Sequence, residues 1–216
     1  MTTSFRDATA DDLDFVAWVE LSASRSHLDR GIWEYMNDQT GDDTVAFLRR
    51  IAATDTVHLF HHSLFVIAEV DGKPAAAMCG YNSATQGFDA YGRDFPAVAG
   101  ASGVLLDDPE FGRRMGVMMS GFASDGDEHA PRWVVENVAT RPEFRRRGLV
   151  AGLLDEMFDR GRDRGFDTAQ ISVFIDNRPA RSAYLKAGFD VVAEQRSDGW
   201  IQEIGCPGTE MMLKTL

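Results

Sequence analysis

The segment ENVATRPEFRRRGLVAGLL, residues 136–154, carries more information about the chain than any other. It reads as a strand, a short turn fixed by Pro142, three consecutive arginines and Gly148 at the mouth of a helix. The first turn of a helix presents unpaired N–H groups and the positive end of the helix dipole, so a phosphate can bind there. Because Gly148 lets the backbone approach a ligand closely and the arginines add positive charge, the segment predicts an anion site. The alternative is that the arginines are a solvated helix start and Gly148 is an ordinary loop residue.

This local positive charge contrasts with the acidity of the whole chain. Lysine and arginine number 22 against 34 acidic residues among 216, which gives a net charge of -12 and a pI of about 4.8. Such an excess of acid argues against broad binding to nucleic acid or to an anionic membrane, because phosphate contacts need clustered cations. The longest apolar runs, such as residues 64–68, are far below the ~20 residues that cross a bilayer, and the first residues contain no apolar signal core. We therefore expect a cytoplasmic protein with no nucleic-acid or membrane partner.

The cysteines and histidines do not form a pattern typical of a metal site. Cys79 and Cys206 lie far apart without C-x-x-C spacing, so we interpret both as reduced thiols. His58, His61 and His62 form an H-x-x-H-H group, but a metal ion would need further ligands. We interpret these histidines as solvated loop residues and expect no metal.

The first part of the chain predicts helices and a hairpin. The expected elements are a strand at residues 4–7, a helix at 13–21, a helix at 32–51 with a break at Thr40 and Gly41, and strands at 63–70 and 73–81. Asp71 and Gly72 stand between the last two strands, and two apolar runs flanking this dipeptide are typical of a tight hairpin.

The second part predicts an irregular stretch and then alternating strands and helices. Residues 82–131 have poor periodicity, except that 111–122 fit a helix with three methionines, and we interpret about 83–131 as an insertion. The methionines are either core residues or an adaptable lining of a binding site. The remaining elements are strands at 133–139 and 168–175, helices at 148–164 and from Pro179 to Gly188, and strands at 189–194 and 210–216. This order indicates a single α/β domain of three layers over residues 1–216.

A second informative segment, DNRPARSAYLKAGF at residues 176–189, follows the strand expected at residues 168–175. The two segments together resemble the GNAT superfamily of acyl-CoA-dependent N-acyltransferases. The first family signature, Gln/Arg-x-x-Gly-x-Gly/Ala, is matched by Arg145 and Gly148, while Val150 departs from it. The second, Asn-x-x-Ala-x-x-x-Tyr-x-x-x-Gly-Phe, is matched at the following positions: Asn177, Ala180, Tyr184, Gly188 and Phe189. The resemblance implies a three-layer α-β-α fold around a central mixed, mostly antiparallel sheet.

The resemblance also implies where acetyl-CoA binds. The pyrophosphate would be held by main-chain amides and basic side chains of the first signature: Arg145, Arg146, Arg147, Gly148, Leu149, Val150 and Ala151. The pantetheine arm would pair as an added strand with Val138, Ala139 and Thr140, and Asn177 would hydrogen-bond it. Tyr184 would sit near the thioester sulfur. The N–H of Val138 is placed to polarise the acyl carbonyl.

Two side chains are candidates for proton transfer during attack of an amine on the thioester. An amine is mostly protonated at neutral pH, so a base must remove a proton, and the leaving thiolate needs an acid. Tyr184 is the candidate acid; the alternative is an aromatic that packs its helix onto the sheet. Glu136 is the candidate base, because alternation places it with Val134 and Val138 on one strand face; the alternative is a salt-bridged or solvated residue.

The sequence predicts an N-acetyltransferase that moves an acetyl group from acetyl-CoA to an amine in a ternary complex. The alternative is a non-catalytic acyl-CoA-binding or protein-interaction module on the same fold. The acceptor would be a small-molecule or peptide amine, and the net charge favours a cationic one. Assembly is left open, with a homodimer as one option.

Overall fold

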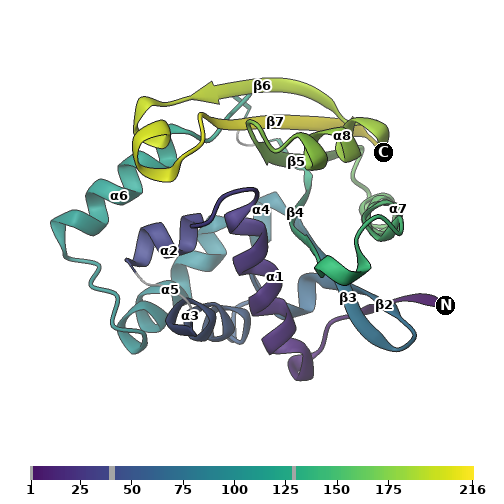
Figure 1. Cartoon of the computed structure of the whole chain (residues 1–216), viewed down its shortest axis with the longest axis horizontal. Helices are drawn as coiled ribbons and strands as arrows, with labels where there is room; N and C mark the ends of the chain where they lie inside the picture. The colour runs from purple at the N-terminus through teal and green to yellow at the C-terminus, as the bar shows by residue number, and fades with distance from the viewer. Residues whose placement is uncertain (1, 39–41, 128–129) are drawn as a thin grey trace.

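A computed structural model describes residues 2–38, 42–127 and 130–216. Its strands form one seven-stranded sheet in the order β1-β2-β3-β4-β5-β7-β6 (Figure 1). The strands are β1 (Thr3–Asp7), β2 (Phe65–Val70), β3 (Lys73–Asn82), β4 (Trp133–Thr140), β5 (Thr168–Phe174), β6 (Asp190–Arg196) and β7 (Gly208–Thr215). Only β4 and β5 pair in parallel, so the expected mixed, mostly antiparallel sheet is confirmed.

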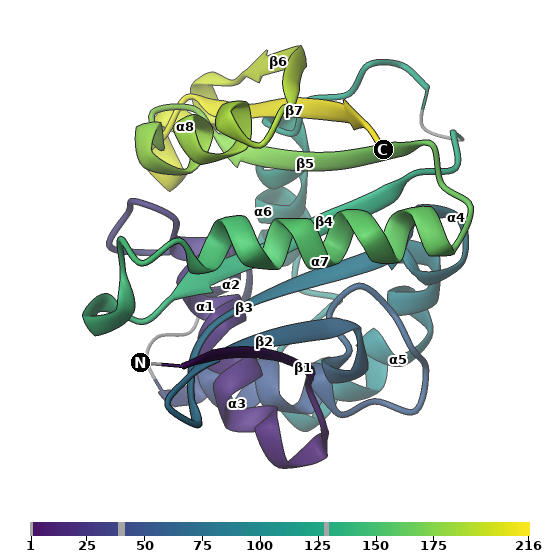
Figure 2. The ribbon, with the colours of Figure 1, turned by 90° about the vertical axis from the view of Figure 1, so that its right-hand side faces the viewer.

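Helices cover both faces of the sheet. The α-helices are α1 (Leu13–Arg25), α2 (Ile32–Asn37), α3 (Asp42–Ala52), α4 (Ser83–Gln86), α5 (Phe88–Ala101), α6 (Pro109–Ser120), α7 (Leu149–Asp163) and α8 (Arg178–Lys186). Short turns of other helix types are η1 (Ala10–Asp12), η2 (His62–Leu64), η3 (Pro142–Phe144) and the π-helix η4 (Trp200–Ile204). Apolar side chains of α1 and α3 pack on one sheet face, and those of α7 pack on the other, which Figure 2 shows from the α7 side. The three expected layers are therefore present.

The hairpin at Asp71 and Gly72 joins β2 to β3 as predicted. Both residues have positive φ, 50° and 74°, which aspartate and glycine tolerate better than most residues. Of the long helix expected at residues 32–51, the structure has α2 and α3, and the break expected at Thr40 and Gly41 lies outside the described residues.

The segment between β3 and β4 is more helical than its periodicity predicted. The helix expected at residues 111–122 is present as α6, but α5 was not predicted, because Gly92, Pro96 and Gly100 lower its intrinsic helix propensity. Ala90, Val98 and Ala99 of α5 are buried, so tertiary packing overrides that preference. Whether this segment is an insertion into a smaller fold stays a prediction.

No helix in the described residues combines the length and apolar character needed to span a lipid bilayer.

Candidate active site

A β-bulge interrupts β4 in the middle of the predicted site. Cys79 of β3 lies opposite Glu136 and Ala77 lies opposite Ala139, so one residue of β3 faces two residues of β4. Asn137, the first of those two residues, has a φ of 52°. The bulge turns the strand, because Val134 and Ala139 belong to the core beneath α1 whereas Val135 and Val138 pack on the α7 side. The expectation that Val138 shares a face with Glu136 is therefore wrong, since strict alternation holds only up to the bulge.

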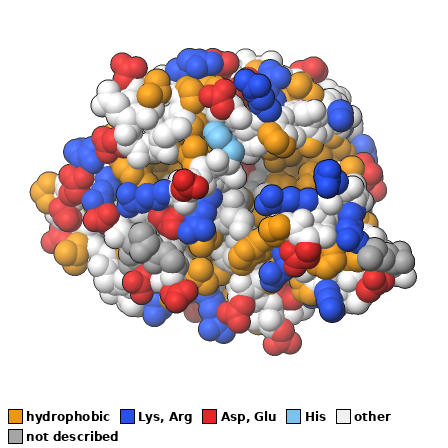
Figure 3. All heavy atoms as spheres, viewed as in Figure 1, with side chains coloured by type: hydrophobic (Ala, Val, Ile, Leu, Met, Phe, Trp, Pro, Cys, Tyr) orange, Lys and Arg blue, Asp and Glu red, His pale blue; other side chains and the backbone are white. Residues whose placement is uncertain are grey.

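Beyond the bulge, β4 separates from β5. The ladder between these strands contains only three pairs, from Trp133–Ala169 to Val135–Ile171. The backbone of residues 136–140 thus has no partner strand on its β5 side. A cavity of about 960 Å³ opens beside it, and its lining includes Glu136, Asn137, Val138, Ala139 and Thr140. Figure 3 shows hydrophobic side chains in the hollow that crosses the middle of this face of the molecule.

Glu136, the candidate base, lies at the cavity wall. Its side chain is half-buried and is hydrogen-bonded by Tyr81, which also lines the cavity. Burial raises the pKa of the Glu136 carboxyl to about 7, and the hydrogen bond from Tyr81 opposes that rise. The carboxyl can therefore take up and release a proton near neutral pH, as a general base must.

Tyr184 and Asn177 come to the same cavity from α8. Tyr184 is 6% exposed, its ring lies 6.3 Å from that of Phe189, and burial raises the pKa of its hydroxyl. The Asn177 side chain caps α8, accepting from the N–H of Ala180 at 3.2 Å, and donates to the hydroxyl of Ser26 at 2.7 Å. Asn177 therefore already has two partners, and its contact with the pantetheine arm stays a prediction.

The loop between β4 and α7 has the open backbone that an anion site requires. Arg146 and Gly148 have positive φ, 61° and 77°, and a Cβ added at Gly148 would meet no atom within 4 Å. Gly148 is the N-cap of α7, so the free N–H groups of the first turn, residues 149–151, begin here. Arg145 reaches back to the carbonyl of Thr140 at 3.4 Å and lines the cavity. Arg147 contacts the carbonyl of Glu143 at 3.3 Å.

Val150, the departure from the signature, packs against the hydrophobic core. It is half-buried and packs against the core between α7 and the sheet, among the residues around Leu153 and Leu154. Its β-branched side chain is therefore accommodated by the core.

The expected solvation of the three histidines is wrong for two of them. His58 is fully buried, with its ring nitrogens 2.9 Å from the hydroxyl of Thr54 and 3.2 Å from the N–H of Phe60. His61 is also buried and caps η2. These rings satisfy backbone and hydroxyl groups in a tight loop, and no cluster of metal-ligating side chains is found in the described ranges.

A group of aromatic side chains lines the cavity on the side of α2, α5 and α6. We call it the aromatic wall: Trp33, Phe60, Tyr91, Phe95 and Phe111. Neighbouring rings touch in sequence, with centroids 4.9 Å apart for Trp33 and Phe60, 5.2 Å for Phe60 and Tyr91, and 5.0 Å for Tyr91 and Phe95. Phe95 and Phe111 follow at 6.2 Å. The wall thus extends from α2 to α6.

The comparisons with known proteins identify the fold and the family. The family model of the acetyltransferase (GNAT) family matches residues 28–189. The chain belongs to the GNAT acetyltransferase family. No curated protein sequence matches this GNAT chain.

Solved structures of acetyltransferases match the GNAT chain over its whole length. A crystal structure of an acetyltransferase has a TM-score of 0.68 at 17% identity, with 98% of each chain covered. An N-acetyltransferase from Staphylococcus aureus Mu50 has a TM-score of 0.60 at 16% identity, covering 98% of this chain and 100% of that one. The polyamine N-acetyltransferase of Drosophila melanogaster, which forms N-acetylagmatine, has a TM-score of 0.57 at 10% identity, with both chains fully covered. At these identities the likeness shows the fold alone.

The aromatic wall is the part of this GNAT chain's site that sequence reasoning missed. Tyr91 and Phe95 lie in the helix that was not predicted. The available signal was the spacing of Phe88, Tyr91 and Phe95, which repeats at three and four residues. Met115, Met118 and Met119 of α6 line the cavity, and Met115 and Met118 also pack against the buried cluster around Trp200, so both readings hold for these two residues.

Proposed function

We propose that the protein is an N-acetyltransferase that moves an acetyl group from acetyl-CoA to an amine by direct attack in a ternary complex. One observation carries the proposal: Glu136 and Tyr184, from strands and helices distant in sequence, line one cavity beside the unpaired stretch 136–140 of β4. A carboxyl with a pKa near 7 and a phenol thus line the same cavity, in which a thioester would meet an amine.

The residues around this stretch fit a CoA-like donor. The side-chain nitrogen of Asn137 and the hydroxyl of Thr140 are buried without a hydrogen-bond partner in the described structure, and the edge of β4 faces the cavity. Val138, Ala139 and Thr140 would pair with the pantetheine arm. The amides of Arg147, Gly148, Leu149, Val150 and Ala151, together with the side chains of Arg145 and Arg146, would hold the pyrophosphate. When bound, acetyl-CoA supplies an activated acyl group and a thiolate leaving group.

The side chains of this chain would handle the two protons of the reaction. Glu136 takes a proton from the amine as the N–C bond forms, and Tyr184 donates its hydroxyl proton to the sulfur as the C–S bond breaks. The N–H of Val138, next to the bulge, stabilises negative charge on the carbonyl oxygen. The products are an amide and free CoA, so atoms and charges balance once Glu136 and Tyr184 exchange their protons with water.

The test is release of thiol from acetyl-CoA by the purified full chain with a panel of amines, alongside calorimetric binding of CoA. Tyr184→Phe should keep the ring against Phe189 and lower kcat about 10- to 100-fold, with a CoA Kd within twofold of the unchanged protein. An unchanged kcat would reject Tyr184 as the acid. Binding of CoA without thiol release from any amine would favour a non-catalytic acyl-CoA-binding module, and no CoA binding would exclude both functions.

A further inference from the structure

The cavity continues past the proposed catalytic residues into a space bounded mainly by apolar side chains. On the sheet side lie Glu136 and Tyr81, and farther out lies the aromatic wall. Aromatic rings pack well against flat apolar groups. This arrangement suits a ligand with an amine at one end and an apolar body at the other.

α6 closes this space with flexible apolar side chains. Phe111, Met115, Met118 and Met119 of this helix line the cavity, and Phe122 follows directly after it. Methionine adapts to ligands of irregular shape. The apolar side of α6 therefore lines the cavity next to the aromatic wall, and Phe111 belongs to both.

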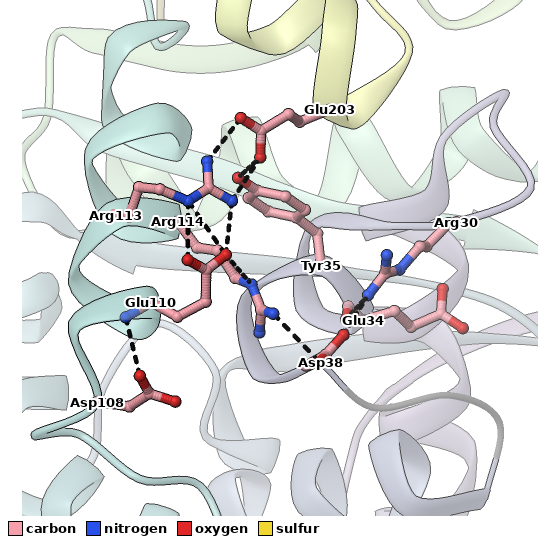
Figure 4. Close-up of polar contacts among 9 residues, drawn as sticks. All are labelled: Arg30, Glu34, Tyr35, Asp38, Asp108, Glu110, Arg113, Arg114 and Glu203. Atoms are coloured by element: carbon pink, nitrogen blue, oxygen red, sulfur yellow. Dashed lines mark hydrogen bonds and ion pairs between the residues drawn. The ribbon is translucent and has the colours of Figure 1, made fainter.

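Ion pairs outside the cavity hold α6 in this position (Figure 4). Arg113 pairs with Glu203 of η4 at 2.6 Å and with Glu110 at 2.7 Å, and Tyr35 of α2 donates to the same Glu203 at 2.7 Å. Arg114 pairs with Asp38 at 3.1 Å. Trp200 of η4 donates to the last carbonyls of α6 at 2.9 Å. Because α2, α6 and η4 are connected in this way, the apolar lining is formed before an acceptor binds.

The cavity is poor in carboxylates that a second cation could use. Its described lining contains Glu136, Asp125 and Asp127 as acidic residues. Asp125 is already paired with Arg132 at 2.6 Å, and Asp127 is exposed. A polyamine would place its additional ammonium groups against aromatic rings and methionines, where a desolvated charge is costly. The lining therefore disfavours a polycationic acceptor.

We infer that the acceptor is a primary monoamine carried on an aromatic or similarly bulky apolar body, with the amine at Glu136 and the body between the aromatic wall and α6. This inference rests on the proposed N-acetyltransferase function and adds the substrate class. It sharpens the expectation from net charge, which favoured cationic acceptors in general.

The test compares amines of different bodies with the full chain and acetyl-CoA, using thiol release as the readout. We expect kcat/KM for 2-phenylethylamine and tryptamine to exceed that for ethylamine, putrescine and spermidine at least tenfold. Equal or higher kcat/KM for spermidine or putrescine would overturn the inference while leaving the proposed function intact. So would acetylation of an alanine-initiated peptide with no turnover of 2-phenylethylamine. Thiol release with none of these amines would overturn the proposed function and the inference with it.

Variants of cavity-lining residues distinguish a loss of acceptor contacts from a general disturbance of the fold. Phe111→Ala and, independently, Met115→Ala should reduce the preference for 2-phenylethylamine over ethylamine at least fivefold, without changing the KM for acetyl-CoA. Ile201→Ala, on an exposed side chain of η4 outside the cavity, is the matched control and should keep the preference. If both lining variants bind CoA normally and keep the full preference, the apolar body does not lie between the aromatic wall and α6.

Discussion

At the residue scale, the side chain with the most informative surroundings is Glu136. It was selected in the sequence because burying a carboxylate among valines is costly unless the carboxylate faces a cleft or has a partner. In the structure Glu136 lines the cavity, and Tyr81 is its partner. The direction in which Val138 points could not be found in the same way. Asn137 adopts a positive φ that strand alternation does not anticipate, so every residue after it changes face. A bulge depends on pairing with a neighbouring strand, and a single strand's sequence does not contain that information.

The prediction for Glu136 concerns pH and rate together. With a pKa of about 7, the carboxyl is protonated below neutrality and cannot accept a proton, so kcat/KM should fall more steeply with decreasing pH below about 7 than above it, where only ionisation of the amine contributes. Glu136→Gln should lower kcat/KM at least ~100-fold and remove this acidic limb. The pH profile of kcat/KM for both proteins checks this, with Glu194→Gln, a partly exposed glutamate on β6, as the control. A glutamine variant that keeps the acidic limb would assign the limb to another group.

At the scale of elements, α7 shows how a departure from a family signature is tolerated. Val150 packs against the core, so we expect its size to affect the packing of α7 more than binding at the proposed anion site. We expect Val150→Ala to lower the free energy of unfolding by roughly 1 kcal/mol, because a partly buried side chain loses apolar contact. The Kd for CoA should stay within twofold. Urea unfolding and calorimetric titration measure the two quantities, and a Kd that improves tenfold in the alanine variant would show that valine does obstruct the ligand.

The elements also show where sequence patterns succeed. The hairpin of β2 and β3 was predictable because Asp71 and Gly72 readily adopt the positive φ angles that the turn requires. The start of α8 was predictable because Asn177 caps it and Pro179 lies in its first turn. α5 was not, because Gly92 and Pro96 argue locally against a helix that only burial of its apolar side stabilises. As a result the sequence predicted the motif-bearing candidate residues, but it did not predict the helix that carries Tyr91 and Phe95 of the aromatic wall.

At the scale of the whole molecule, His58 links stability to pH. It is fully buried, and burial lowers its pKa from 6.5 to about 4, so the folded chain holds it neutral. The unfolded chain binds a proton below about pH 6.5, so this histidine destabilises the fold progressively as the pH falls from about 6.5 to 4. We expect a loss of ~2 kcal/mol from this group by pH 5. His58→Gln should reduce the difference between the free energies of unfolding that urea unfolding gives at pH 7 and at pH 5. His27→Gln, which changes an exposed histidine, should leave this difference unchanged. An equal pH dependence of the free energy of unfolding in all three proteins would refute the role of His58.

The arrangement of the whole site also predicts the order of chemical events. Donor and acceptor would share one cavity, with the donor along residues 136–140 of β4 and the acceptor toward the aromatic wall, so both can be present at once. A covalent acyl-enzyme would need an accessible nucleophile such as a thiolate. The chain's two cysteines are both buried outside the cavity lining, and the Sγ of Cys79 donates to the carbonyl of Leu59 at 3.1 Å.

Burial, together with the nearby carboxyls of Glu136 and Glu20, raises the pKa of the Cys79 thiol, so it stays protonated and unreactive. Double-reciprocal plots of initial rate against one substrate at several fixed concentrations of the other should therefore intersect. Mixing enzyme with acetyl-CoA alone should give no burst of free thiol. Parallel lines accompanied by a stoichiometric burst would require an acyl-enzyme, and the Glu136 carboxylate would then be the first side chain to examine as its carrier, because it faces the cavity and the cysteines do not.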